Sequence, residues 1–150
     1  MRTLSALAAL TATMWAGGCT SPTLPPPTLA GTSWQLLAIQ SMDDRQGTLT
    51  VADPSRYTLS FGRDGSAVMR LDCNRASAPW KMTPGPEASS GSLTFGPVAA
   101  TRALCPPPSI DARVLRDLPY VRSFLLRDGR LHLSLMADGG IYSWGPVTNP

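Results

Sequence analysis

Histidine, net charge and recognisable catalytic groupings are all scarce in this sequence of 150 residues. Its 13 Lys and Arg stand against 10 Asp and Glu, a formal net charge of +3, and no run of basic residues concentrates that charge. Proteins that bind nucleic acids use a basic patch or an aromatic-rich motif to hold the phosphate backbone or the bases, and the sequence shows neither. We therefore expect no nucleic-acid partner.

The one histidine, His132, alternates with Leu131 and Leu133, which is typical of an exposed position on a strand. No Ser-His-Asp set, pair of carboxylates or Gly-rich phosphate loop stands out. The adjacent Asp43 and Asp44 fit a solvated loop better than a cation site. We expect no catalytic residue, no metal and no cofactor, and we predict that the protein is not an enzyme.

The N-terminal segment is typical of an exported protein. Arg2 precedes a mainly apolar stretch, Leu4 to Trp15, which is too short for a stable helix across about 30 Å of hydrocarbon. The following Ala16-Gly17-Gly18-Cys19 resembles the bacterial lipobox, whose cysteine becomes the lipidated first residue of the mature protein, although Ala16 stands where that motif usually has Leu. We predict a lipoprotein signal peptide over residues 1–18 and a lipid (palmitate) anchor on Cys19, which attaches the protein to the membrane. The alternative is an ordinary secretory signal with an incidental cysteine.

A Pro-rich segment follows the predicted anchor, over residues 19–28. Proline lacks a backbone donor and favours extended polyproline structure, so this segment is predicted to be a tether of about 3.1 Å per residue. Thr20 stands where an Asp commonly marks retention in the inner membrane. We therefore expect an outer-membrane lipoprotein whose single domain is periplasmic and monomeric.

Cys73 and Cys105 remain once Cys19 is assigned to lipid, an even number in a protein expected to be exported. We predict that they form a disulfide, which closes a loop of about 33 residues and stabilises the fold by roughly 3 to 4 kcal/mol in the chain-entropy model. The rival interpretation is a reactive thiol at Cys105, before a predicted helix, although the only histidine is His132. Two cysteines and one histidine do not have the spacing of a zinc site.

Apolar and polar residues alternate with period two along most of the chain, which predicts half-buried strands. Asp-Gly and Gly-Gly turns separate the last of these segments and favour consecutive hairpins. One helix is predicted after Ser109, with apolar residues from Ile110 to Leu118 on one face and Pro119 ending it. The predicted fold is mainly β with one short helix: a curved antiparallel sheet or incomplete barrel closed by the helix. The alternating segments are Trp34–Leu36, Tyr57–Phe61, Leu93–Phe95 and Leu131–Leu135.

Several motifs resemble, in order and spacing, the META domain of the heat-shock protein HslJ. They are Leu29 to Leu37, Cys73-Asn74-Arg75, Leu93 to Phe95 followed by Ala100 to Cys105, and the terminal hairpin. The resemblance covers roughly residues 29–145 and implies a META domain at 29–146 with a tail at 147–150. The sequence departs from the family at Asp72, where Gly is usual, and at Ala78-Pro79-Trp80, where Gly-Tyr or similar is usual. The family is associated with heat shock, antibiotic tolerance, and secretion or motility, without an established reaction.

Two groups of residues are candidates for binding. Asn74, Arg75, Thr101 and Arg102 flank the two cysteines, and a disulfide would bring them side by side as a polar patch. They can equally cap turns, satisfy buried backbone groups or cover apolar surface. Trp80 and Trp144 can line a pocket at a barrel mouth, although core packing is the default for both.

The sequence leaves three function classes open. We favour a non-enzymatic envelope lipoprotein that binds another, unidentified envelope protein in stress tolerance or assembly. The alternatives are a carrier of lipid or another hydrophobic ligand, and an inhibitor of an exported hydrolase such as lysozyme, which rests on similarity of size and compartment alone. A continuous apolar cavity would favour the carrier, whereas a filled core with an exposed patch would favour protein binding.

Overall fold

The computed structural model describes residues 28–43 and 45–147. The predicted signal peptide, Cys19, almost all of the tether, Asp44 and residues 148–150 lie outside this part of the chain. No helix in the described ranges is long and apolar enough to cross a membrane.

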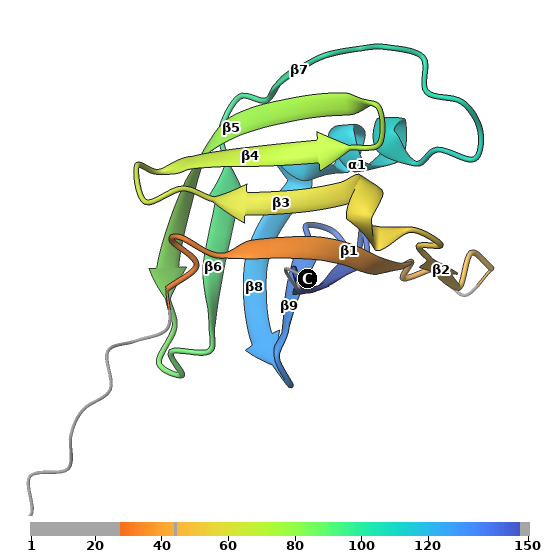
Figure 1. The fold of residues 1–150 in the computed structure, drawn as a ribbon. Coiled ribbons are helices and arrows are strands. Elements are labelled where there is room, and N and C mark those ends of the chain that lie inside the picture. The colour runs from red at the N-terminus through yellow and green to blue at the C-terminus, as the bar shows by residue number, and fades with distance from the viewer. Residues whose placement is uncertain (1–27, 44, 148–150) are drawn as a thin grey trace, which may run out of the picture.

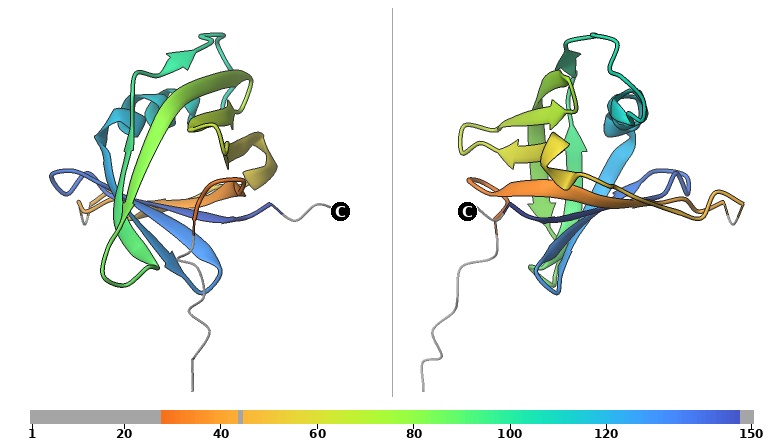
Figure 2. Two further views of the ribbon diagram at one scale, coloured as in Figure 1. Left: turned by 90° about the vertical axis from the view of Figure 1, so that its left-hand side faces the viewer. Right: turned by 45° about the vertical axis from the view of Figure 1, so that its right-hand side comes forward.

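Antiparallel strands make up most of the domain (Figures 1 and 2). The chain forms β1 (Ser33–Gln40), β2 (Thr48–Thr50), the 3-10 helix η1 (Pro54–Arg56), β3 (Tyr57–Phe61), β4 (Ser66–Leu71), β5 (Asn74–Pro84), β6 (Ser90–Phe95) and β7 (Ala99–Ala100). The helix α1 (Asp111–Asp117), the 3-10 helix η2 (Leu118–Tyr120), β8 (Val121–Arg127), β9 (Arg130–Leu135) and β10 (Ile141–Pro146) follow. The four alternating segments of the sequence lie in β1, β3, β6 and β9, so the mainly β prediction is confirmed.

The sheet closes on itself, which corrects the expected fold. Eight strands follow one another in the order β10, β9, β8, β6, β5, β4, β3 and β1, and β1 then pairs with β10 from Trp34↔Pro146 to Gln40↔Ile141. The prediction of an open curved sheet or incomplete barrel was therefore wrong: the fold is a closed antiparallel barrel. Closure pairs the outer edge of β10 with β1. It removes an exposed edge that would otherwise offer free backbone hydrogen-bond donors and acceptors.

The helix covers part of the barrel and does not complete its wall. The predicted apolar face is confirmed, since Val114 and Leu118 are buried with the strand residues while Ile110 and Leu115 pack against them. The helix begins at Asp111, and η2, which contains Pro119, continues it directly into β8. The loop between β7 and α1 arches away from the barrel (Figure 1).

The interior of the barrel is filled by inward-facing side chains. Residues from six strands have between 0 and 1% of their surface exposed: Leu36, Leu59, Met69, Leu93, Leu131, Leu133 and Trp144. The pocket between α1 and the barrel measures only about 10 Å³ and is lined by residues such as Val114, Tyr142 and Trp144. Close packing of this kind is what a folded core requires, and it leaves no space there for an acyl chain.

Candidate functional site

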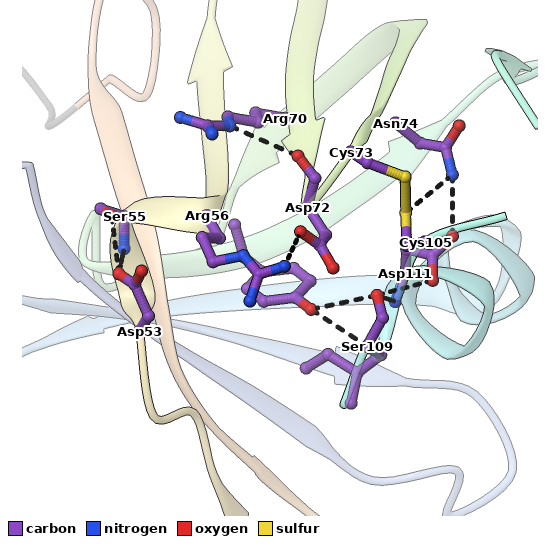
Figure 3. A network of polar contacts seen from close by, with 12 residues as sticks. Asp53, Ser55, Arg56, Arg70, Asp72, Cys73, Asn74, Cys105, Ser109 and Asp111 are labelled. Carbon is purple, nitrogen blue, oxygen red and sulfur yellow. Dashed lines mark hydrogen bonds and ion pairs between the residues drawn. A yellow bond between two sulfur atoms is a disulfide. The ribbon is translucent and has the colours of Figure 1, made fainter. Parts of the chain in front are cut away.

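A disulfide joins the β4–β5 turn to the long loop after β7. Cys73 lies in the turn and Cys105 in the loop, with their Cα atoms 5.6 Å apart. The bond brings together two segments that are 32 residues apart in the sequence (Figure 3). The loop is therefore covalently tied to the barrel at its centre.

Asn74, at the first position of β5, holds the same loop through its side-chain amide. Its Oδ1 accepts hydrogen bonds from the Ala103 N–H and the Thr101 hydroxyl, both at 2.8 Å. Its Nδ2 donates to the Ala103 carbonyl and to Asp111 Oδ2, both at 2.9 Å, and lies 3.3 Å from Cys105 Sγ. Asn74 is 1% exposed. Its amide groups are fully used within the protein, so they position the loop and are not free to bind a ligand.

The hydrogen bonds from Asn74 to the loop form a clamp, and the other polar candidates are divided between this clamp and the surface. Thr101 extends the clamp, because its hydroxyl accepts from the Arg75 N–H at 3.0 Å and its own N–H donates to the Arg75 carbonyl at 3.0 Å. The side chains of Arg75 and Arg102 are exposed. The structure thus brings Asn74 and Thr101 together as supporting residues and leaves Arg102 as a surface residue of the loop.

A second polar cluster lies below the disulfide (Figure 3). Asp72 is 6% exposed and forms an ion pair with Arg56. The Ser109 hydroxyl donates to Asp111 Oδ1 at 2.8 Å, and the Tyr57 hydroxyl accepts from the Ile110 N–H at 3.1 Å. The Tyr57–Ile110 bond fixes the start of α1 against β3.

The charges of this cluster favour the ionised form of Asp72. The Ser109 hydroxyl and the guanidinium groups of Arg56 and Arg70 hold the pKa of Asp72 below its usual range, against the opposing effect of its burial. A lowered pKa suits a permanent anion that pairs with arginine, and it is the opposite of what a general acid or base near neutral pH requires.

Asp72 also explains one departure from the family pattern. Its φ is +60°, in the left-handed region that glycine adopts without strain and that Asp tolerates better than most residues. The turn therefore has a backbone conformation that glycine favours, although the residue here is Asp. The substitution adds a carboxylate for Arg56.

An open groove of about 800 Å³ lies between the loop and α1. Leu104, in the wall of this groove, is 98% exposed, the largest exposed fraction among the large apolar residues of the described chain. Arg102 and Arg116 add positive charge, and Asp111 adds one carboxylate already bonded to Asn74 and Ser109. The groove is therefore apolar in part, with two basic side chains at its surface.

The two tryptophans are placed in the barrel and not at a common pocket. Trp144 is 1% exposed. Trp80 is half-buried, contacts Phe61 edge to face with ring centroids 5.0 Å apart, and donates from Nε1 to the Ser66 carbonyl at 3.1 Å. Both therefore serve the packing of the barrel.

His132 lies on β9, away from the clamp. Its Nδ1 is 3.0 Å from the Ser143 hydroxyl on β10, and both line a separate groove of about 620 Å³ on the outside of the barrel. Within residues 28–43 and 45–147, no three His, Cys, Asp or Glu side chains gather closely enough to hold a metal ion.

Sequence reasoning did not identify Leu104, Ser109 and Asp111 as members of one site. Ser109 and Asp111 carried a signal, because they were placed at the start of the helix, but their partners come from β3 and β5. Nothing in the local pattern showed that Leu104 is fully exposed, since an apolar residue next to a cysteine ordinarily predicts burial.

Comparison with known proteins identifies the family. A family model of the META domain matches residues 27–142, whereas no curated protein matches the chain. Solved structures with the same fold include the NMR structure of a protein from Burkholderia xenovorans, with a TM-score of 0.63 and 22% identity over 90% of this chain and 100% of that one. Another is the crystal structure of a DUF4847 family protein from Bacteroides vulgatus, with a TM-score of 0.55 and 9% identity over 81% of this chain and 96% of that one. These identities show likeness of fold alone. The family match includes both cysteines, the Asn74 clamp and the helix, and the chain belongs to the META domain family.

Proposed function

We propose that this chain is a non-enzymatic, HslJ-like envelope lipoprotein whose META domain binds another protein through the loop Thr101–Pro108. In this proposal Cys19 carries the lipid, the monomeric domain faces the periplasm from the outer membrane, and the bound protein takes part in envelope stress tolerance or assembly. Neither nucleic acid nor a cofactor is involved.

One observation carries the proposal: the barrel interior is filled, while Leu104 stands 98% exposed beside an open groove. Ligand sites for small hydrophobic molecules enclose about 300 to 1,000 Å³, so the pocket of about 10 Å³ beside α1 argues against a carrier that holds its ligand inside the barrel. An exposed leucine costs free energy in water unless a partner covers it, and a clamped loop loses little entropy when it binds.

Site-specific photo-cross-linking in native envelopes tests this function. A photoreactive residue in place of Leu104 should give a discrete protein adduct, and the same residue in place of Leu125 should not. Leu125 is a matched control because it is an exposed leucine (36%) on β8 that lines the other groove.

The functional counterpart is complementation of a deletion strain under envelope stress. Leu104→Ser should weaken complementation while Leu125→Ser should not, at equal protein level and thermal stability. Full complementation by Leu104→Ser, together with equal cross-linking at both positions, would show that the loop is not the binding surface.

A further inference from the structure

The loop Arg102–Cys105 has one backbone edge bound to the barrel and the other edge free. The N–H of Thr101 and both backbone groups of Ala103 bond to Arg75 and Asn74. In the described part of the chain, no internal hydrogen bond uses the N–H or C=O of Arg102 or Leu104. Arg102 and Leu104, on either side of the bonded Ala103, therefore leave their backbone groups free, and another chain can pair with them.

The spacing of these free groups matches the way an endopeptidase holds a substrate. Such enzymes form backbone hydrogen bonds with an extended substrate at two residues: the one immediately before the scissile bond, and the one two positions earlier. The residue immediately before the scissile bond puts its side chain into a specificity pocket. Leu104 and Arg102 have this spacing, and the Leu104 side chain is 98% exposed. The bond that would lie in the active site is Leu104–Cys105.

The same loop would be held on both sides of that bond after cleavage. Ala103 is fixed through two hydrogen bonds to the Asn74 amide, and Cys105 is fixed by its disulfide to Cys73, the neighbour of Asn74. Pro106, Pro107 and Pro108 follow and stiffen the chain beyond the disulfide. A leaving group that cannot diffuse away favours the reverse reaction.

We infer that this loop is a substrate-like inhibitory loop for an exported serine endopeptidase with an apolar specificity pocket. The inference rests on the proposed function and names the partner class of the same loop. Preorganisation of the free edge lowers the entropic cost of binding, and Leu104 fills the pocket.

The covalent step is reversible in this arrangement. The serine hydroxyl of the enzyme adds to the Leu104 carbonyl carbon, and its proton passes through the enzyme's base to the Cys105 nitrogen as the Leu104–Cys105 bond breaks. The acyl-enzyme carries Leu104 as an ester while the Cys105 amine stays in place through the disulfide. Attack of that amine on the ester restores the peptide bond and the serine hydroxyl, so the complex persists and net hydrolysis is slow.

Inhibition assays with the purified full chain test the inference. Chymotrypsin and subtilisin, two serine endopeptidases that accept apolar side chains, should be inhibited, whereas trypsin, which requires a basic side chain, should not. Leu104→Asp should weaken inhibition of the first two by at least ~30-fold, the effect expected of a central interface residue. Leu104→Lys should transfer inhibition to trypsin, while Leu125→Lys, the matched control, should not.

A positioning variant separates an inhibitor from a substrate. Asn74→Ala should raise the rate of cleavage at Leu104–Cys105, measured by mass spectrometry, while Arg75→Ala leaves it unchanged. Each variant is compared at a temperature at which its far-ultraviolet circular dichroism matches that of the wild type.

Two outcomes would overturn the inference. One is that the folded wild-type chain inhibits neither chymotrypsin nor subtilisin, and the other is that it is cut at Leu104–Cys105 as fast as an unstructured peptide. If either occurs while the photo-cross-link at Leu104 still captures a protein that is not an endopeptidase, the protein-binding function stands and only this partner class is wrong.

Discussion

At the scale of single residues, Asn74 determines the conformation of the exposed loop. The sequence placed Asn74 and Thr101 near each other because they flank the two cysteines, and the structure has them in contact at 2.8 Å. Sequence reasoning left binding and structural roles open, because local pattern does not reveal that the amide is 1% exposed and bonded to residues 27 to 37 positions away. Such long-range bonds depend on the barrel that brings β5 and the loop together.

Replacement of Asn74 by alanine should destabilise the protein. It would remove the Asn74 amide from the Ala103 N–H and C=O, which have no other partner in the described chain, and from the Thr101 hydroxyl and the Asp111 carboxylate, which keep Arg75 and Ser109. A buried polar group left unpaired costs about 1 to 3 kcal/mol. Since part of this loop can reach water, we expect the free energy of unfolding to fall by about 2 to 4 kcal/mol. Urea denaturation with the disulfide intact measures it. Arg75→Ala, an exposed neighbour, should change it by less than about 0.5 kcal/mol, and equal values for the two variants would contradict the clamp.

Asp72 should make the stability of the protein depend on pH in the acid range. Its folded-state pKa is lowered by Ser109, Arg56 and Arg70, so its contribution is present above its unfolded value of about 3.9 and is lost as pH falls through the lower folded value. The difference in unfolding free energy between the wild type and Asp72→Asn should therefore be constant from neutral pH down to the unfolded pKa and shrink below it. Denaturation at a series of pH values measures the difference. A difference that grows as the pH falls would have the wrong sign for this ion pair.

At the scale of elements, the hairpins were predictable and the closure was not. The turns at Asp64-Gly65, Asp128-Gly129 and Asp138 to Gly140 carry their own sequence signals, and they fall between β3 and β4, β8 and β9, and β9 and β10. The pairing of β1 with β10 has no local signal, because alternation marks a strand without specifying which strand completes its other edge. For the same reason an open sheet was predicted.

Gly140 lies in a turn that the sequence predicts and next to the end of β1, where the barrel closes. Its φ is +116°, and a Cβ added there would lie 2.5 Å from the carbonyl oxygen of Gln40, at the end of β1. Gly140→Ala should therefore lower the free energy of unfolding by more than about 2 kcal/mol, since it adds a backbone clash to an unfavourable φ. Gly129→Ala is the matched control, because its φ is +69° and nothing lies within 4 Å of the added Cβ, so only about 1 kcal/mol of strain is expected. Equal losses in urea denaturation would mean that the contact with Gln40 does not constrain the closure.

At the scale of the whole molecule, the filled barrel is a rigid core, and in the proposed function the clamped loop outside it is the recognition surface. The eight-stranded ring carries the packing, and the disulfide together with Asn74 transfers that rigidity to a loop outside it. Composition and motifs were sufficient to recognise the family and the mainly β class. They were insufficient for the site, because the exposure of Leu104 results from how the loop is tied at Ala103 and Cys105 and not from its own residue type.

The same molecule should be held at a membrane by lipid on Cys19. Each buried methylene contributes about 0.8 kcal/mol, and stable anchoring takes more than one acyl chain, so a fully modified cysteine should keep the protein in the membrane fraction through a carbonate wash. Intact-mass analysis of the wild type should give a chain beginning at Cys19 with added lipid mass, and Cys19→Ala should lack that mass. Cys73→Ser is the control, because it removes a cysteine of the disulfide and should leave the lipid in place. A wild-type mass without lipid, or an unchanged mass and membrane retention in Cys19→Ala, would show that the anchor is not at this residue. The Pro-rich tether of about 3.1 Å per residue would then no longer set the distance between the loop and the membrane.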